Sequence, residues 1–161
     1  MISVTDVTVT IGDHTLLHDI TFTARAGEVT GLIGPNGAGK STMLAVLSGD
    51  LERQSGEITV AGCDPAVTAP QELARARAVM LQDVTVSFDF LVRDVVAMGR
   101  RPWHNKPQAE YDDAIIDAAL QATDTTHLAG RDISTLSGGE RARVALARVL
   151  AQQTPVIMLD E

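Results

Sequence analysis

The chain has 161 residues and a mass of 17.1 kDa, which is the size of one ordinary domain. Its 13 Lys and Arg residues against 21 Asp and Glu residues give a formal net charge of −8, and 3% of its residues are aromatic. This composition argues against broad nucleic-acid binding, which needs clustered positive charge and aromatic stacking surfaces. A single cysteine, Cys63, excludes an intrachain disulfide and a four-cysteine zinc site.

Neither a membrane span nor a secretion signal is visible in the sequence. No run of about 18 apolar residues occurs, and residues 1–6 lack the basic and apolar regions of a signal peptide. We therefore expect a cytoplasmic protein.

Residues 2–33 are predicted to form strands. Ile2, Val4, Val7, Val9 and Ile11 alternate with polar residues, and the extra residue at Asp6 indicates a bulge. A second extended run covers residues 16–23, and the apolar residues 29–33 predict a short third strand.

The rest of the chain alternates between helix and strand patterns. The expected helices cover residues 40–48, 70–76, 92–98, 109–122 and 139–152, and the loop 99–107 separates the third from the fourth. The expected strands cover residues 57–61, 78–81 and 156–161. We expect residues 156–159 to lie in the middle of a parallel sheet whose covering segments come after residue 161. Strands on both sides of a helical block predict an α/β core with a helical insertion.

A glycine-rich segment carries the first chemical motif. Its nine residues are Gly34, Pro35, Asn36, Gly37, Ala38, Gly39, Lys40, Ser41 and Thr42, which match the phosphate-binding pattern G-x-x-x-x-G-K-[ST]. Backbone N–H groups and the N-terminus of the following helix would surround the phosphates. Lys40 would neutralise the β- and γ-phosphates, Ser41 would hold Mg²⁺, and Thr42 would contact the α-phosphate.

The second motif is at the end of the chain. Four apolar residues, 156–159, precede Asp160 and Glu161. Downstream of a phosphate loop, this pattern predicts that Asp160 supports Mg²⁺ and that Glu161 orients the water that attacks the γ-phosphate. Because a strand ending in two acidic residues is common, the prediction depends on the phosphate loop.

The third motif comprises Leu136, Ser137, Gly138, Gly139 and Glu140. Ser137 and Glu140 have the spacing of a capping box, which predicts a helix start. The two glycines leave bare backbone close to a helix N-terminus, where an anion is favoured. Together with residues 141–151, this segment resembles the signature motif of the ATP-binding cassette (ABC) family.

The resemblance spans the chain and implies a P-loop NTPase (RecA-like) core with antiparallel N-terminal strands and an inserted α-helical subdomain. It assigns residues 1–85 to the nucleotide-binding core, 86–152 to the helical subdomain and 153–161 to a strand returning to the core. It also makes Gln82 the family's switch glutamine, which would touch Mg²⁺ or the attacking water. The family continues well past Glu161, so the remainder of the core is missing and we expect the 161-residue chain alone to hydrolyse ATP poorly.

Two further departures from the family pattern stand out. The family usually places an aromatic residue where Ile11 stands, so only apolar contact with adenine is expected there. The family's switch histidine comes after the second motif, whereas His14, His18, His104 and His127 all precede it.

The resemblance also implies partners. Two copies pair head to tail in the family, so residues 136–140 of one copy would act on the nucleotide of the other. ATP and Mg²⁺ would be the cofactors, and transmembrane permease subunits would hold the protein at the cytoplasmic face of the membrane. A haem- or chelate-binding protein would take part indirectly, and no nucleic acid is expected.

Two segments indicate the transported substrate. Residues 88–103 resemble the corresponding stretch in importers of iron complexes, haem and cobalamin, and residues 122–128 are most similar to the hemin-import branch. Iron-siderophore or cobalamin import, a non-transport ABC ATPase and an inactive remnant remain alternatives. Trp103 and its arginines would lie either near the membrane partner or in an ordinary surface loop. We do not expect the histidines to bind haem, because the ATPase of such a system does not carry the cargo.

Overall fold

The computed structural model describes residues 1–80 and 90–160. These residues form two compact units, and each is described by itself. The first unit comprises residues 1–77 together with Asp160, and the second comprises residues 78–159. The division predicted between residues 85 and 86 lies outside the described residues.

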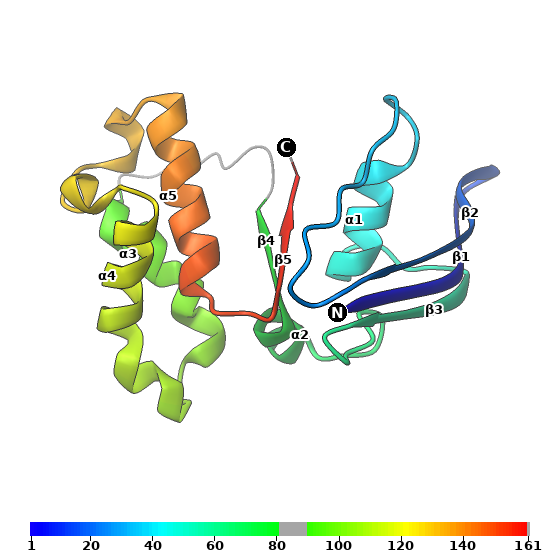
Figure 1. Cartoon of the computed structure of the whole chain (residues 1–161), viewed down its shortest axis with the longest axis horizontal. Coiled ribbons are helices and arrows are strands. Elements are labelled where there is room, and N and C mark those ends of the chain that lie inside the picture. Colours follow the sequence, from blue (N-terminus) through cyan, green and yellow to red (C-terminus); the bar gives the residue numbers. More distant parts are fainter. Residues whose placement is uncertain (81–89, 161) are drawn as a thin grey trace. The chain divides into compact units, whose positions relative to one another are not determined.

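The first unit contains a three-stranded antiparallel sheet with the order β2-β1-β3 (Figure 1). The strands are β1 (Ile2–Ile11), β2 (His14–Ala24) and β3 (Ser55–Val60). Along β1 the buried residues Ile2 and Val4 are followed, three positions later, by buried Val7 and Val9. The predicted bulge is confirmed, because Asp6 has a φ of 51° and the register with β2 shifts between Val4 and Val7. The extra residue keeps both halves of the apolar pattern on the core side of the sheet.

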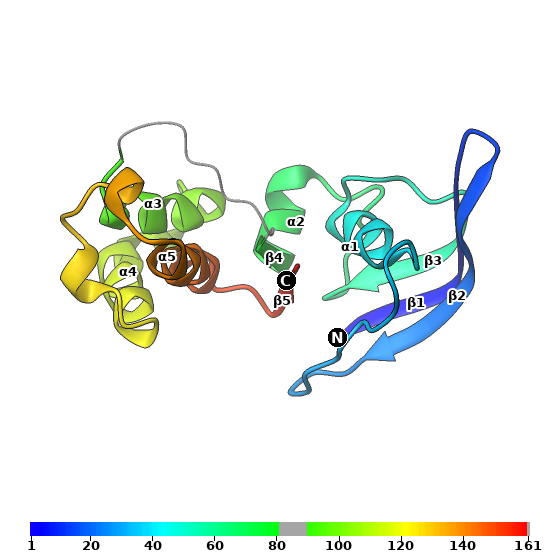
Figure 2. The same cartoon turned by 90° about the horizontal axis from the view of Figure 1, so that it is seen from above.

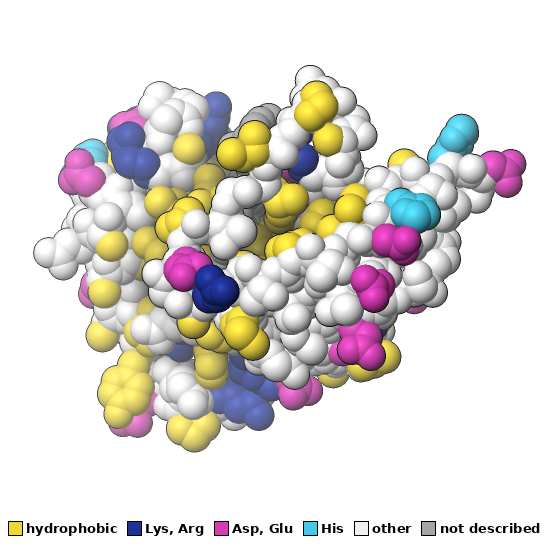
Figure 3. Space-filling model, turned by 45° about the vertical axis from the view of Figure 1, so that its right-hand side comes forward, with side chains coloured by type: hydrophobic (Ala, Val, Ile, Leu, Met, Phe, Trp, Pro, Cys, Tyr) yellow, Lys and Arg dark blue, Asp and Glu magenta, His cyan; other side chains and the backbone are white. Residues whose placement is uncertain are grey.

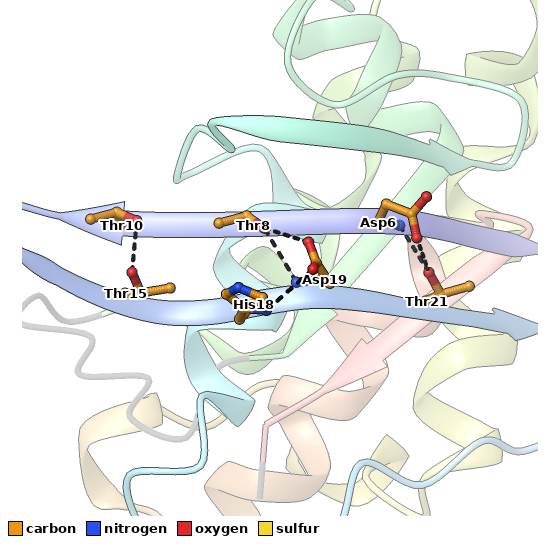
Figure 4. Close-up of polar contacts among 7 residues, drawn as sticks. All are labelled: Asp6, Thr8, Thr10, Thr15, His18, Asp19 and Thr21. Atoms are coloured by element: carbon orange, nitrogen blue, oxygen red, sulfur yellow. Dashed lines mark hydrogen bonds and ion pairs between the residues drawn. The ribbon is translucent and has the colours of Figure 1, made fainter.

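Polar side chains tie β1 to β2 along the exposed face of this hairpin (Figure 4). The backbone N–H of Asp6 donates to Thr21 Oγ1 at 2.9 Å, and the Thr21 hydroxyl donates back to Asp6 Oδ1 at 3.0 Å. Thr8 and Asp19 form the same reciprocal pair, at 3.2 and 3.3 Å, and Asp19 also has a left-handed φ of 48°. The His18 ring lies 3.3 Å from the Asp19 carboxylate. These contacts satisfy backbone groups that the irregular ladder leaves unpaired.

Two helices complete the first unit, and both have the bounds that the sequence predicts. They are α1 (Lys40–Ser48), which ends at a left-handed Gly49, and α2 (Pro70–Ala76), which has Pro70 in its first turn. Apolar side chains of the sheet and both helices supply the buried core of this unit: Ile2, Val4, Val7, Val9, Leu17, Met43, Val46, Leu47, Ile58, Val60, Leu73 and Ala76.

Three helices of the second unit pack side by side around one apolar core (Figure 2). They are α3 (Val92–Ala97), α4 (Asp112–Ala122) and α5 (Gly138–Ala151). Four short 3₁₀ segments connect or extend them: η1 (Met98–Trp103), η2 (Pro107–Tyr111), η3 (Thr126–Leu128) and η4 (Ile133–Thr135). The core includes Val92, Val96, Leu120, Leu128 and Val144.

A two-stranded sheet of β4 (Arg77–Met80) and β5 (Val156–Leu159) accompanies the helices. The sequence predicts an apolar strand at residues 156–161, and the structure has a strand at Val156–Leu159 that is buried on one face. Val156 and Met158 are buried, whereas Ile157 is 44% and Leu159 57% exposed.

Two other expectations differ from the structure. The apolar residues 29–33 form no strand, and Val29 and Ile33 are almost fully exposed. Apolar character alone does not make a strand, because each strand also needs a partner for its backbone groups. The loop expected at residues 99–107 begins instead with the 3₁₀ turns of η1, which continue directly from α3. None of the helices in the described part of the chain has the length and apolar character needed to cross a bilayer.

Candidate functional site

The phosphate loop (residues 34–42) leads directly into α1. Gly37 and Gly39 both have a φ of 84°, a left-handed conformation that glycine adopts without strain. At Gly39 the space is closed as well, because a Cβ atom there would lie 2.6 Å from Leu17 Cδ2 and 3.0 Å from the Leu16 carbonyl oxygen. The close approach of β2 therefore requires glycine at the last loop position, and it fixes the point at which α1 begins.

The N-terminus of α1 is arranged to receive an anion. Its N-cap residue, Gly39, provides no side-chain cap, and the first turn contains no acidic residue. The first N–H groups of a helix have no partner within the helix and carry the positive end of its dipole. At Gly37, nothing lies within 4 Å of the position that a Cβ atom would occupy, so the loop backbone is open there. A phosphate group fits this combination of free donors, positive potential and space.

Lys40 places its charge at the same loop. The Nζ atom donates to the carbonyl oxygens of Gly34 at 2.8 Å and Pro35 at 2.9 Å. A further hydrogen bond, from Ala38 N to Pro35 O at 3.2 Å, closes the turn beneath it. The ammonium group is therefore held over the loop backbone by neutral acceptors, with no carboxylate among these contacts to neutralise it.

The residues predicted to hold Mg²⁺ are only partly described. Ser41 is exposed in the first turn of α1, and Asp160 is partly buried directly after β5. Asp160 belongs to the first unit, which also carries the phosphate loop. The other two predicted residues, Gln82 and Glu161, lie outside the described residues. Within residues 1–80 and 90–160, no group of three or more His, Cys, Asp or Glu side chains is placed to hold a metal ion. A hydroxyl and one carboxylate suit Mg²⁺ bound together with phosphate oxygens, which is its usual manner of binding beside nucleotides.

The signature segment (residues 136–140) forms the predicted helix start. Ser137 is the N-cap of α5, and its Oγ atom accepts from the Glu140 N–H at 3.3 Å. The Glu140 carboxylate in turn accepts from Ser137 N at 2.8 Å and from Ser137 Oγ at 2.7 Å. The side-chain hydrogen bond from Ser137 is the main reason why the pKa of Glu140 lies below its usual value, and nearby Arg131 and Arg143 act in the same direction.

The glycines of this segment leave its surface open, whereas the leucine is internal. Nothing lies within 4 Å of a Cβ atom at Gly138, and at Gly139 only Arg143 Nη1 comes as near as 3.9 Å. Leu136 is 4% exposed and packs in the core of the helical unit. The backbone of Gly138 and Gly139 is thus accessible to a ligand or partner, and the Leu136 side chain anchors the segment from beneath.

The predicted adenine contact and the histidines lie on the surface. Ile11 is 54% exposed at the end of β1, where it pairs across the hairpin with His14. His14, His18, His104 and His127 are all exposed. Histidine and acidic side chains follow one another along the outer part of the hairpin (Figure 3). Ile11 can therefore offer an apolar surface.

The motif search missed two contributions to the site. One is Leu17, whose packing against Gly39 positions the phosphate loop; an apolar residue of a strand carries no signal for this role. The other is Arg141, whose Nη1 donates to the Leu136 carbonyl oxygen at 3.0 Å and braces the signature segment. The sequence shows that Arg141 follows Glu140, but it does not show that the Arg141 side chain points back to Leu136.

Comparisons with known proteins match this arrangement. The chain is 54% identical over 146 residues to the hemin import ATP-binding protein HmuV of Nocardia farcinica, a match that covers 91% of this chain and 51% of that protein. It is 42% identical over 160 residues to the cobalamin import ATP-binding protein BtuD of Halobacterium salinarum, covering 99% of this chain and 40% of that protein. The chain thus spans about half the length of these relatives.

A solved structure shows the same fold. The ATP-binding subunit of an ABC transporter superposes with a TM-score of 0.87 at 23% identity, covering 99% of this chain and 65% of that one. In addition, the model of the ABC transporter family matches residues 17–161, a range that begins in β2 and includes all three motifs. The chain therefore belongs to the ABC transporter family.

Proposed function

We propose that the complete protein binds and hydrolyses ATP as the energy-coupling subunit of an ABC importer for hemin or a related iron complex. The observation that carries this proposal is the 54% identity to a hemin import ATP-binding protein over a segment that contains the phosphate loop and the signature segment. The open N-terminus of α1, with Lys40 above it, supports nucleotide binding at the loop.

The phosphate loop and the acidic residues have separate tasks in this proposal. The backbone N–H groups of the loop and of the first turn of α1 would donate to phosphate oxygens, except that of Ala38, which donates to the Pro35 carbonyl oxygen. Lys40 would transfer its hydrogen bonds from Gly34 and Pro35 to the β- and γ-phosphates. Ser41, Gln82 and Asp160 would hold Mg²⁺, which supplies positive charge to the phosphates during transfer. Glu161 would accept a proton from the attacking water.

The signature segment acts on the other copy in a head-to-tail dimer. The accessible backbone of Gly138 and Gly139 at the N-terminus of α5 suits the γ-phosphate held by the partner's loop. The Ser137 hydroxyl currently donates to Glu140, so contact with the phosphate requires the hydroxyl to turn. Two sites would then form at once, each completed by the other copy.

The transport role follows from the relatives. We propose that two permease subunits bind the dimer at the cytoplasmic face of the membrane and that a haem- or chelate-binding protein delivers the cargo. The likeness to a cobalamin import protein at 42% identity favours cobalamin as the second candidate, with iron-siderophore complexes in the same chemical class of large chelates.

Reconstitution tests this function directly. The full-length subunit and its permease are placed in lipid vesicles, and ATP hydrolysis and uptake are measured with hemin, cobalamin and a ferric siderophore in turn. Hemin uptake that needs ATP and stops in Lys40→Ala supports the proposal. Uptake of cobalamin alone, or of the siderophore alone, identifies that compound as the substrate in place of hemin. ATP hydrolysis without any uptake favours a non-transport ATPase. Absence of ATP hydrolysis by the full-length protein supports the inactive remnant.

A further inference from the structure

Arg100 is the most deeply buried charged side chain among the described residues, with 3% of its surface exposed. Its guanidinium group donates in three directions: Nε to Asp112 Oδ1 at 2.7 Å, Nη1 to the Ala151 carbonyl at 2.8 Å and Nη2 to the Gln108 carbonyl at 3.4 Å. A buried charge is costly unless it is paired and hydrogen-bonded. Arg100 therefore connects four segments: η1, η2, the start of α4 and the end of α5.

Two neighbours of Arg100 hold the same end of α5. Trp103 Nε1 donates to the Gln152 carbonyl at 2.7 Å, and the Arg100 guanidinium lies 5.4 Å from the centre of the Trp103 ring. A Cβ atom at Gly99 would lie 2.2 Å from the Arg148 carbonyl oxygen, so η1 approaches the helix as closely as backbone allows. Together, Gly99, Arg100 and Trp103 form a clamp on the last turn of α5.

The clamp lies at the C-terminal end of the helix that begins at the signature segment. The last carbonyls of a helix lack partners within the helix and carry negative partial charge, so a buried cation stabilises them. Here the clamped helix begins at the signature segment, and only residues 152–155 separate its end from β5, which Asp160 follows. The clamp thus contacts the end of α5 directly before the segment that leads to β5.

We propose that Arg100, supported by Asp112 and Trp103, is a positioning residue for ATP hydrolysis, which it serves by fixing the junction between α5 and β5. This inference rests on the proposed function. Arg100 is not proposed to touch the nucleotide. It acts through α5, whose N-cap is Ser137, and through β5, which Asp160 follows. Loss of the clamp lets the junction move, so the turnover rate falls while ATP binding at the phosphate loop is kept.

The test compares Arg100→Met with Arg101→Met in the full-length subunit. Arg101 is the adjacent arginine and is exposed, so Arg101→Met makes the same chemical change outside the clamp. For Arg100→Met we expect a kcat at least about tenfold lower, a dissociation constant for ATP within about twofold of the wild type, and partial recovery in Arg100→Lys. Arg101→Met should match the wild type in both quantities.

A milder variant keeps the proposal falsifiable if Arg100→Met does not fold. Trp103→Phe keeps an aromatic ring at this position but removes the indole N–H that donates to Gln152. We expect it to lower kcat by about threefold with unchanged ATP affinity. If the folded variants of Arg100 or Trp103 keep the wild-type kcat and lose only thermal stability, the clamp is purely structural and the inference is wrong. If the wild-type subunit itself binds no ATP or never hydrolyses it, the proposed function fails first.

Discussion

The Nζ atom of Lys40 lies 2.8 Å from the carbonyl oxygen of Gly34, at the opposite end of the phosphate loop. The side chain therefore folds back across the loop that it serves, and its charge is held by a weak neutral acceptor. A phosphate is a stronger acceptor for an ammonium group than a carbonyl oxygen is. When Lys40 donates to a phosphate oxygen in place of the Gly34 carbonyl oxygen, it keeps the same number of hydrogen bonds and each new bond is stronger.

Replacement of Lys40 by alanine should remove most of the affinity for ATP. The phosphates then lose the side-chain cation that lies over the loop, and we expect affinity to fall by at least about 100-fold, in line with the 2–3 kcal/mol of a charge-assisted contact. Calorimetric titration with Mg-ATP measures the change. Lys106→Ala is the matched control, because Lys106 is the chain's other lysine and is exposed. Equal affinities in the two variants would contradict the role assigned to the loop.

Replacement of Glu161 by glutamine should trap the full-length protein as a dimer when ATP is present. The variant lacks the carboxylate proposed to accept the proton of the attacking water, but keeps the phosphate loop and the signature segment. Bound ATP then persists between the two copies. Sedimentation velocity at saturating ATP should show a dimer, and the double variant Lys40→Ala/Glu161→Gln should remain a monomer. A monomeric single variant with ATP bound would count against the head-to-tail arrangement.

Local patterns in the sequence predicted most of the elements, because their signals lie within a few residues. The capping spacing of Ser137 and Glu140 gave the start of α5 within one residue, and Lys40 and Gly49 marked α1. The bulge at Asp6 was also visible, as one extra residue between apolar positions. Such features depend on neighbours along the chain, which the sequence displays directly.

The features that the sequence did not reveal depend on distant partners. Residues 29–33 have the apolar character of a strand but make no strand pairing in the structure. For Arg100 and Trp103 the sequence left a surface loop and a contact with the membrane partner open. Their carbonyl acceptors, Ala151 and Gln152, lie about fifty residues later, in the last residue of α5 and its C-cap. Side-chain pairing over such a separation leaves no periodic signal in one sequence.

Substitution of Gly99 by alanine should destabilise the helical unit. The added Cβ atom would meet the Arg148 carbonyl oxygen at 2.2 Å, which is backbone and cannot move aside without shifting η1 from α5. Overpacking of this kind costs about 1–3 kcal/mol. Gly130→Ala is the matched control, because nothing lies within 4 Å of its added methyl group. Thermal unfolding of both variants should show a clearly lower melting temperature for Gly99→Ala alone.

The pair of Arg53 and Asp64 should make the first unit sensitive to acid. Arg53 Nη1 and Nη2 donate to the two oxygens of Asp64 at 2.9 and 2.7 Å, and this hydrogen bonding holds the pKa of Asp64 below its usual value of 3.8. Since the folded-state pKa is the lower one, the stabilisation is complete above about pH 5 and is lost as the pH falls through the ordinary pKa and then the folded-state pKa. Asp64→Asn should therefore reduce the free energy of unfolding at pH 7 by about 1.5 kcal/mol. It should also flatten the decline in stability below pH 4.

Denaturant titrations at pH 7, 4 and 3 measure both effects, with Asp124→Asn as the control on an exposed aspartate. An Asp64→Asn profile parallel to that of the wild type at all three pH values would show that the pair does not cause the acid sensitivity.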